Sequence, residues 1–164
     1  MSQVHATPSR AVLEMVLAES YGGFTPFSRA LDGLSPQDAV RVPDGSPHSV
    51  ADIVAHMVFW QQRFLSMVDG QQPVPVPSAS VGWPAVTADQ WPALAERYLA
   101  GLARYRELAT DEPGLARVVV EGRPMTVGSG IIDYFMHAAH HLGQVILLRR
   151  IIGAWPPAGG GDSW

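Results

Sequence analysis

Apolar residues recur at every third or fourth position along much of the chain, and this spacing predicts amphipathic helices. The first such stretch begins at Thr7-Pro8, a capping residue followed by proline at the first helical position, and runs to about residue 34. Pro26 lacks a backbone N–H and follows two glycines, so we expect a kink or break near residues 22–26. Residues 35–38 then predict a short capped turn.

Two further helices follow from the same pattern. One starts after Ser49, with Asp52 placed to complete a capping box, and ends at Gly70. The next spans about residues 87–109. Residues 71–86 separate the two helices, with proline at every second position in "QPVPVP". That composition predicts an extended, polyproline-like crossover rather than a domain boundary.

The last part of the chain predicts a small hairpin followed by a long buried helix. Residues 117–127 form the expected hairpin around Glu121-Gly122, and the helix spans about residues 128–152. This helix is apolar almost all round, as buried helices are. Four long helices with one long crossover between the second and third predict an all-α four-helix bundle, with residues 1–164 as a single domain.

Composition narrows the possible functions. The chain has no cysteine, which excludes thiolate metal ligands, a cysteine nucleophile and disulfides. Its net charge of −4 gives no basic footprint for nucleic acid. We find neither a signal-peptide pattern at the N-terminus nor an apolar run that is long enough to span a membrane. We therefore expect a cytoplasmic protein that acts without nucleic-acid or membrane partners.

The histidines are the candidate metal ligands of this chain. Three of the six lie within "MHAAHHLGQ", and His137 and His141, four positions apart, share one face of the last helix. Imidazoles so placed can reach one metal ion, whereas His140 lies about 100° further round the helix. His56 sits among the apolar positions of the second long helix and therefore points inward as well.

Each of these signals also has a simpler explanation. A lone inward histidine such as His56 is usually a core residue with one hydrogen bond, and the spacing of His137 and His141 is common on helices. Three inward imidazoles without acidic partners are, however, costly to bury unless they are paired or bind a metal. We therefore predict a site of three histidines. Ala138 stands where zinc peptidases of the H-E-x-x-H type have their glutamate base, which argues against peptide hydrolysis.

Polar residues one turn away from the histidines are candidates for orienting them. Asp52 and Asp133 precede His56 and His137 by one turn, and either could accept the second ring N–H. Both would equally suit a helix start. Gln144 follows the H-x-x-x-H pair and would either hydrogen-bond a ligand ring or pack structurally.

Three larger side chains are candidates for a substrate pocket. Trp60 lies one turn beyond the inward histidine of its helix and would line a cavity, although core packing would also explain it. Arg63 and Arg149 could bind an anionic substrate, and the simpler alternative is that both are solvated. The sequence leaves open whether the C-terminal "GGGDSW" covers the mouth of the site.

The histidine pattern resembles that of the DinB-like (DinB/YfiT) superfamily. His56 in "SVADIVAHMVFWQQRF", followed about eighty residues later by "HAAHHLGQVILLRR", is similar to that family's isolated histidine and later H-x-x-x-H-x-G-Q-[IV] motif. The resemblance runs from the first helix to Gly153. It implies a four-helix bundle, a frequent homodimer, and a site in which His56, His137 and His141 bind one divalent ion such as zinc, nickel or iron.

The same resemblance implies a chemistry. Members include transferases and isomerases that use low-molecular-weight thiols such as mycothiol or bacillithiol. The expected function is therefore a metal-dependent S-transferase in which an activated thiol attacks an electrophilic small molecule. The alternative is a non-catalytic, stress-related protein that binds a metal or a small molecule. A third possibility is a helical dimer whose histidines have lost their role.

Overall fold

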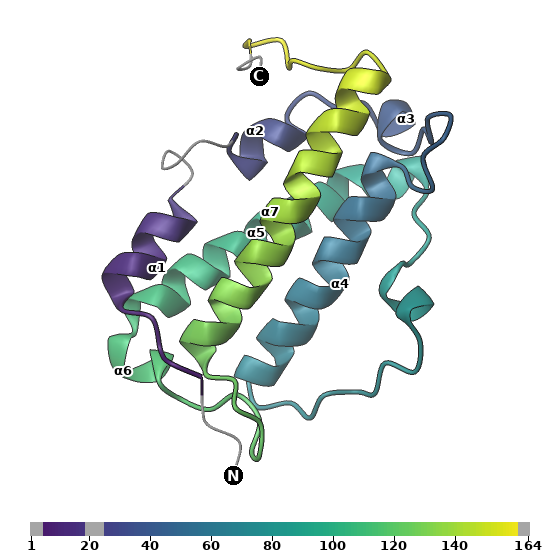
Figure 1. The fold of residues 1–164 in the computed structure, drawn as a ribbon. Coiled ribbons are helices and arrows are strands. Elements are labelled where there is room, and N and C mark those ends of the chain that lie inside the picture. The colour runs from purple at the N-terminus through teal and green to yellow at the C-terminus, as the bar shows by residue number, and fades with distance from the viewer. Residues whose placement is uncertain (1–4, 19–24, 161–164) are drawn as a thin grey trace.

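Four helices form the body of the protein, and a shared apolar core lies between them (Figure 1). The computed structural model describes residues 5–18 and 25–160. The four helices are α1 (Arg10–Leu17), α4 (Val50–Val68), α5 (Trp91–Thr110) and α7 (Val127–Ile151). α4 packs against α5 and α7, and α1 packs against the same two helices. The predicted all-α bundle is confirmed.

Shorter helical segments connect these four helices. They are α2 (Phe27–Leu31), α3 (Pro36–Ala39), η1 (Ala79–Gly82), η2 (Ala88–Gln90) and α6 (Glu112–Leu115). The last of these has the sequence "EPGL". Asp111 caps it by accepting a hydrogen bond from the backbone N–H of Gly114. A capped turn of helix therefore follows α5 directly.

The first predicted helix is shorter than expected. Ser9, rather than Thr7, caps α1, and its hydroxyl accepts from the backbone N–H of Val12. The helix ends at Leu17, and helical structure resumes at Phe27, directly after Pro26. The interruption near proline is thus present, although residues 19–24 lie outside the described part of the chain.

Helix α4 carries one of the predicted ligands and follows its predicted boundaries. Its Ser49 hydroxyl accepts from the N–H of Asp52, and the Asp52 carboxylate accepts from the N–H of Ser49, which completes a capping box. The helix ends just before Gly70, which has a φ of +86°, a left-handed conformation that glycine adopts without strain. The cap at Ser49 and the glycine at position 70 set the bounds of α4, and its buried face includes His56.

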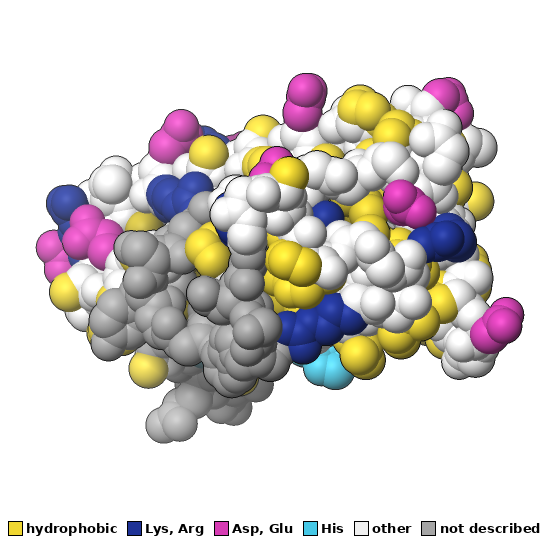
Figure 2. Space-filling view, turned by 90° about the horizontal axis from the view of Figure 1, so that it is seen from above, with side chains coloured by type: hydrophobic (Ala, Val, Ile, Leu, Met, Phe, Trp, Pro, Cys, Tyr) yellow, Lys and Arg dark blue, Asp and Glu magenta, His cyan; other side chains and the backbone are white. Residues whose placement is uncertain are grey.

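The crossover and the hairpin both differ from expectation. Residues 71–86 are not extended throughout, because the turn of 3₁₀ helix η1 interrupts them (Figure 1). The hairpin reduces to one antiparallel bridge between Val118 and Thr126, with the turn at Gly122. No described helix is long and apolar enough to cross a membrane. On the face seen in Figure 2, acidic and basic side chains are interspersed among apolar ones.

Candidate metal centre

Two antiparallel helices bring the three predicted histidines together. His56 comes from the first half of α4, and His137 and His141 come from the middle of α7 (Figure 1). The Nε2 atom of His137 lies 3.2 Å from Nε2 of His56 and 2.9 Å from Nε2 of His141. One ring nitrogen of each histidine thus faces a common point.

Hydrogen bonds on the far side of two rings fix which nitrogen carries the proton. The Nδ1 atom of His56 lies 2.7 Å from the carbonyl oxygen of Gly82, which can only accept, so Nδ1 donates. The Nδ1 atom of His141 lies 2.7 Å from Oε1 of Gln144 and donates in the same way. In both neutral rings the Nε2 lone pair is therefore directed at the common point.

This arrangement fits a divalent cation. If Nε2 of His137 carries a proton, it can donate to Nε2 of His56 or of His141 but not to both. At least one ring nitrogen then has no partner, whereas a cation could bind all three. Ligand nitrogens about 2.0–2.1 Å from a tetrahedral ion lie about 3.3–3.4 Å apart, close to the observed separations. The donor set of three imidazoles suits zinc, nickel or iron. A small outward movement of the rings would accommodate the ion.

Burial keeps these imidazoles neutral. His56 is 8% exposed and His141 is 6% exposed, and burial is the main cause that lowers the pKa of each. The pKa of His137 falls to about 4, first because of burial and then because His141, His56 and His140 lie nearby. Because a metal binds the neutral ring, the site is prepared for a cation at neutral pH.

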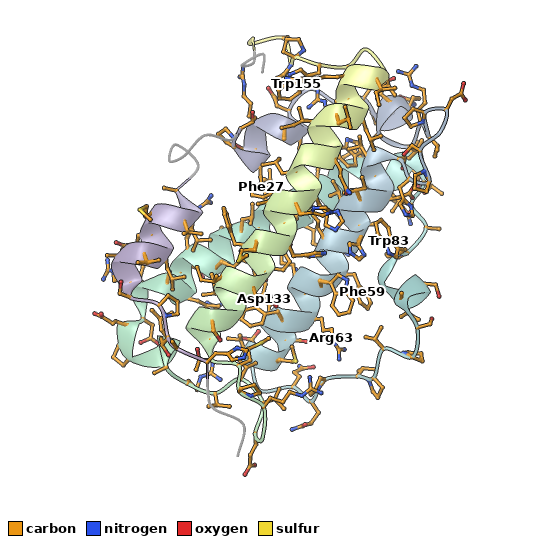
Figure 3. The ribbon with its side chains drawn as sticks, viewed as in Figure 1. Phe27, Phe59, Arg63, Trp83, Asp133 and Trp155 are labelled. Atoms are coloured by element: carbon orange, nitrogen blue, oxygen red, sulfur yellow. The ribbon has the colours of Figure 1, made fainter. Side chains whose placement is uncertain are left out.

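The crossover contributes a part of the site that the sequence did not indicate. The indole of Trp83 stacks on the ring of His56, with centroids 3.9 Å apart and planes 15° apart. The ring of His48 in turn stacks on Trp83, with centroids 3.9 Å apart and planes 6° apart, and His48 is half-buried. Figure 3 shows Trp83 on the crossover, facing α4. Together with Gly82, Trp83 holds the His56 ring in place.

The two aspartates do not orient the histidines. Asp52 is occupied by the cap of α4, and the ring of His56 bonds to Gly82 instead. Asp133 is exposed on α7, and within the described chain it makes no hydrogen bond to His137. The role of Asp52 is to cap the helix, because its carboxylate reaches back over the first turn to Ser49. Of the polar candidates, Gln144 is the one that contacts a ligand ring.

A cavity of about 400 Å³ opens beside the histidines. His137 lies in its wall, and Trp60 lines it, as the sequence suggested. The wall also holds Tyr134, and its charged members are Arg63, Arg123 and Asp133. The cavity is large enough for a small substrate, which would lie on the His137 side of an ion held by the three histidines.

Arg149 has neither of the two roles expected for it. It is 1% exposed, so it is not solvated, and it lies on α7 two turns beyond His141. Its guanidinium donates to the carbonyl oxygens of Ala30, Asp32 and Ala154. It therefore ties α2 and the segment after α7 together and leaves no donor directed at a substrate. Arg63 does line the cavity and also donates to the carbonyl of Val74.

The remaining histidines lie outside the cluster. His140 is exposed, its Nε2 atom lies 3.3 Å from Nε2 of Gln144, and its ring lies edge-to-face with that of His141 at 5.1 Å, but it directs no ring nitrogen at the common point. His5 lies at the described N-terminus, where its backbone N–H donates to Pro124. Residues 161–164, the end of the "GGGDSW" tail, lie outside the described residues.

Comparison with known proteins agrees with this architecture. A model of the DinB superfamily matches residues 25–145, which include α4, the crossover and the histidines of α7. The chain therefore belongs to the DinB superfamily. No curated protein and no solved structure matches it significantly.

Replacing Gln144 with leucine should weaken metal binding by roughly 10- to 100-fold, because the Nδ1–H of His141 loses its acceptor. Gln144→Glu, which retains an acceptor oxygen, should restore most of the affinity. Gln37→Leu, at an exposed position on α3, is the matched control. Competition with a chromophoric chelator measures the three affinities. Equal affinity in Gln144→Leu and the control would mean that the glutamine only packs.

Metal affinity should persist to lower pH than an exposed histidine pair would allow. Protons compete for a ring only below its pKa, and the pKa is lowered in all three rings, to about 4 for His137. The titratable groups that face these rings are His48, His140 and Asp133. Chelator competition between pH 7.5 and 4.5 should show affinity falling only well below pH 6.5. A fall that begins above pH 6.5 would contradict the lowered pKa values.

Proposed function

We propose that this protein is a metal-dependent transferase that activates a low-molecular-weight thiol for attack on an electrophilic small molecule. One observation carries the proposal: three Nε2 atoms converge on one point beside a cavity of about 400 Å³. His56, His137 and His141 would hold the divalent ion and leave a coordination position open. A divalent ion in such a site lowers the pKa of a thiol or water that binds to it.

The residues of the cavity would bind and orient the two reactants. Trp60 and Tyr134 provide apolar surface beside the histidines. Arg123 would pair with a carboxylate of the thiol, and Asp133 would accept hydrogen bonds from its hydroxyl or amino groups. Because the chain has no cysteine, the reacting sulfur would come from the co-substrate.

Turnover of a thiol with an electrophile tests the proposal. Mycothiol or bacillithiol is mixed with monobromobimane or fosfomycin and the zinc-, nickel- or iron-loaded protein. With monobromobimane a C–S bond forms and a C–Br bond breaks, and the thiol proton passes to solvent. With fosfomycin the epoxide C–O bond breaks and its oxygen takes up the proton. Turnover above the uncatalysed rate, lost in His141→Ala and kept in His140→Ala, supports the transferase.

The same experiment identifies the alternative. If the protein retains metal but turns over none of these combinations, the transferase proposal fails. A non-catalytic metal-binding role then accounts for the centre.

We also propose that the protein forms a homodimer through α7. Met136, Leu147 and Ile151 lie on one side of this helix, and each is more than half exposed. Gly143 lies between them, and a Cβ there would meet open space. A second copy of α7 could approach closely at this glycine. Light scattering should show a dimer for the unchanged chain and a monomer for Leu147→Glu.

The control for that experiment is Val42→Glu, which adds the same charge at an exposed valine before α4. It should remain dimeric. A monomer for the unchanged chain at micromolar concentration, or dimers for both variants, would show that this face of α7 is not an interface.

A further inference from the structure

A second and larger cavity lies on a different side of α4 from the metal centre. Its volume is about 780 Å³, it is open to solvent on one side, and α4, the crossover and the start of α5 line it. None of the three histidines lines it. Phe59 and Arg63 project from α4 into the space between this helix and the crossover, as Figure 3 shows. The transferase proposed above needs no pocket here.

The walls of this cavity are mostly apolar. α4 contributes Val58 and Phe59, α5 contributes Leu94, and the crossover contributes valine and proline side chains. The valines of the crossover wall are Val74, Val76, Val81 and Val86. A concave apolar space of this volume lies within the range of about 300–1,000 Å³ that is typical of small-molecule sites.

The charges in the cavity are all of one sign. Arg63 and Arg97 are its ionisable residues, and none of its described lining residues is acidic. Arg63 donates to the carbonyl of Val74, and Arg97, within the described chain, has no carboxylate at ion-pair distance. The remaining polar residues of the wall are neutral amides and a serine, so nothing in the wall offsets the positive charge.

We propose that this cavity binds an amphipathic organic anion, with the apolar body against the crossover and the acidic group on Arg97 and Arg63. Guanidinium groups pair with carboxylate, sulfonate or phosphate oxygens through charged hydrogen bonds. Although the chain carries a net charge of −4, both ionisable groups of this cavity are positive, so the local charge favours an anion there.

Octanoate and 1-octanol are the test probes, because they share an apolar chain and differ in charge. Calorimetry on the full-length, metal-loaded protein at pH 7.5 should show octanoate binding at least tenfold more tightly than octanol. Decanoate should bind at least fivefold more tightly than octanoate, because two more methylenes are buried. No octanoate binding at millimolar concentration, or equal binding of octanoate and octanol, would overturn the proposal.

Two variants place the probe in the cavity. Arg97→Gln should weaken octanoate about tenfold and leave octanol unchanged, whereas Ala93→Trp, at an exposed position in the wall, should weaken both. Arg104→Gln, on the same helix but paired with Asp69 and Glu107, is the control. Metal content should be equal in all of them, so a failed metal centre is distinguishable. Octanoate affinity that responds alike to Arg97→Gln and Arg104→Gln would contradict the assignment.

Discussion

Replacing His137 with alanine should empty the metal centre, and replacing His140 should leave it filled. His137 is the ring whose Nε2 atom lies within 3.2 Å of both other Nε2 atoms, so its loss removes the central one of the three ligand nitrogens. His140 touches the ring of His141 and the amide of Gln144, but it offers no nitrogen to the common point. The two variants remove the same ring from the same helix, three positions apart.

Metal content of the purified, tag-free chain measures this difference. The unchanged protein and His140→Ala should each hold about one equivalent of zinc, nickel or iron, and His137→Ala should hold almost none. Loss of a ligand should cost more than the roughly 10- to 100-fold that loss of an orienting partner costs. His56→Ala and His141→Ala should behave like His137→Ala, because each contributes one nitrogen to the same point.

Two results would contradict this assignment. If His140→Ala alone lost the metal, the ligand set would be wrong. If the unchanged chain held no metal even after reconstitution, the histidines would be a buried cluster and the transferase proposal would fall with the site. Circular dichroism of each variant shows whether the helices remain folded, so that loss of the ion is not confused with loss of the fold.

The helices that position the ligands were predictable because they follow local rules. The capping box of Ser49 and Asp52 sets where α4 begins, and the apolar pattern then directs His56 inward. The four-residue spacing of His137 and His141 places both on one face whatever the rest of the chain does. That α4 and α7 are neighbours was implied by the family resemblance, and the structure confirms it.

The part of the crossover that contacts His56 could not be predicted, because it follows the proline repeat and has no periodic pattern of its own. Gly82 acts through its backbone carbonyl, which every residue has, so no side chain indicates this role. Trp83 lies next to a proline in an irregular segment, so helical or strand periodicity cannot show which way its side chain points. The sequence "VGWP" is in retrospect a turn that places a carbonyl and an indole against one imidazole. Only the packing of the crossover on α4 could show this.

Arg149 shows how a local rule can mislead. An arginine in the last turn of a helix is normally explained by the helix dipole and by solvent. Here α2 and the segment after α7 fold over it, and their carbonyls surround the guanidinium. Burial lowers the pKa of this group, while the charges of Asp32 and Asp38 act in the opposite direction. The arginine therefore stays charged and belongs to the core.

Arg149→Met should consequently destabilise the protein by about 2–5 kcal/mol. Methionine fills much of the same space, but it leaves the buried carbonyl of Ala30 and the partly buried carbonyls of Asp32 and Ala154 without their donor, at up to about 1–3 kcal/mol for each. Removing a buried charge returns part of that cost. It also removes the contact with Trp155, whose ring centre lies 5.3 Å from the guanidinium carbon. For a chain of this size, the melting temperature should fall by roughly 5–15 °C.

Urea unfolding at fixed metal concentration measures the effect. Arg150→Met is the control, because Arg150 is the next residue on the same helix and its side chain is exposed. That control should change the free energy of unfolding by no more than about 0.5 kcal/mol. Arg149→Lys should lose most of the stability that Arg149→Met loses, since one ammonium cannot span three separated carbonyls as a planar guanidinium does. Both variants of Arg149 should retain the metal when folded, because the arginine contacts none of the three ligands. If Arg149→Met were as stable as the control, the three carbonyls would be satisfied by water, and this end of the bundle would be open rather than closed around the charge.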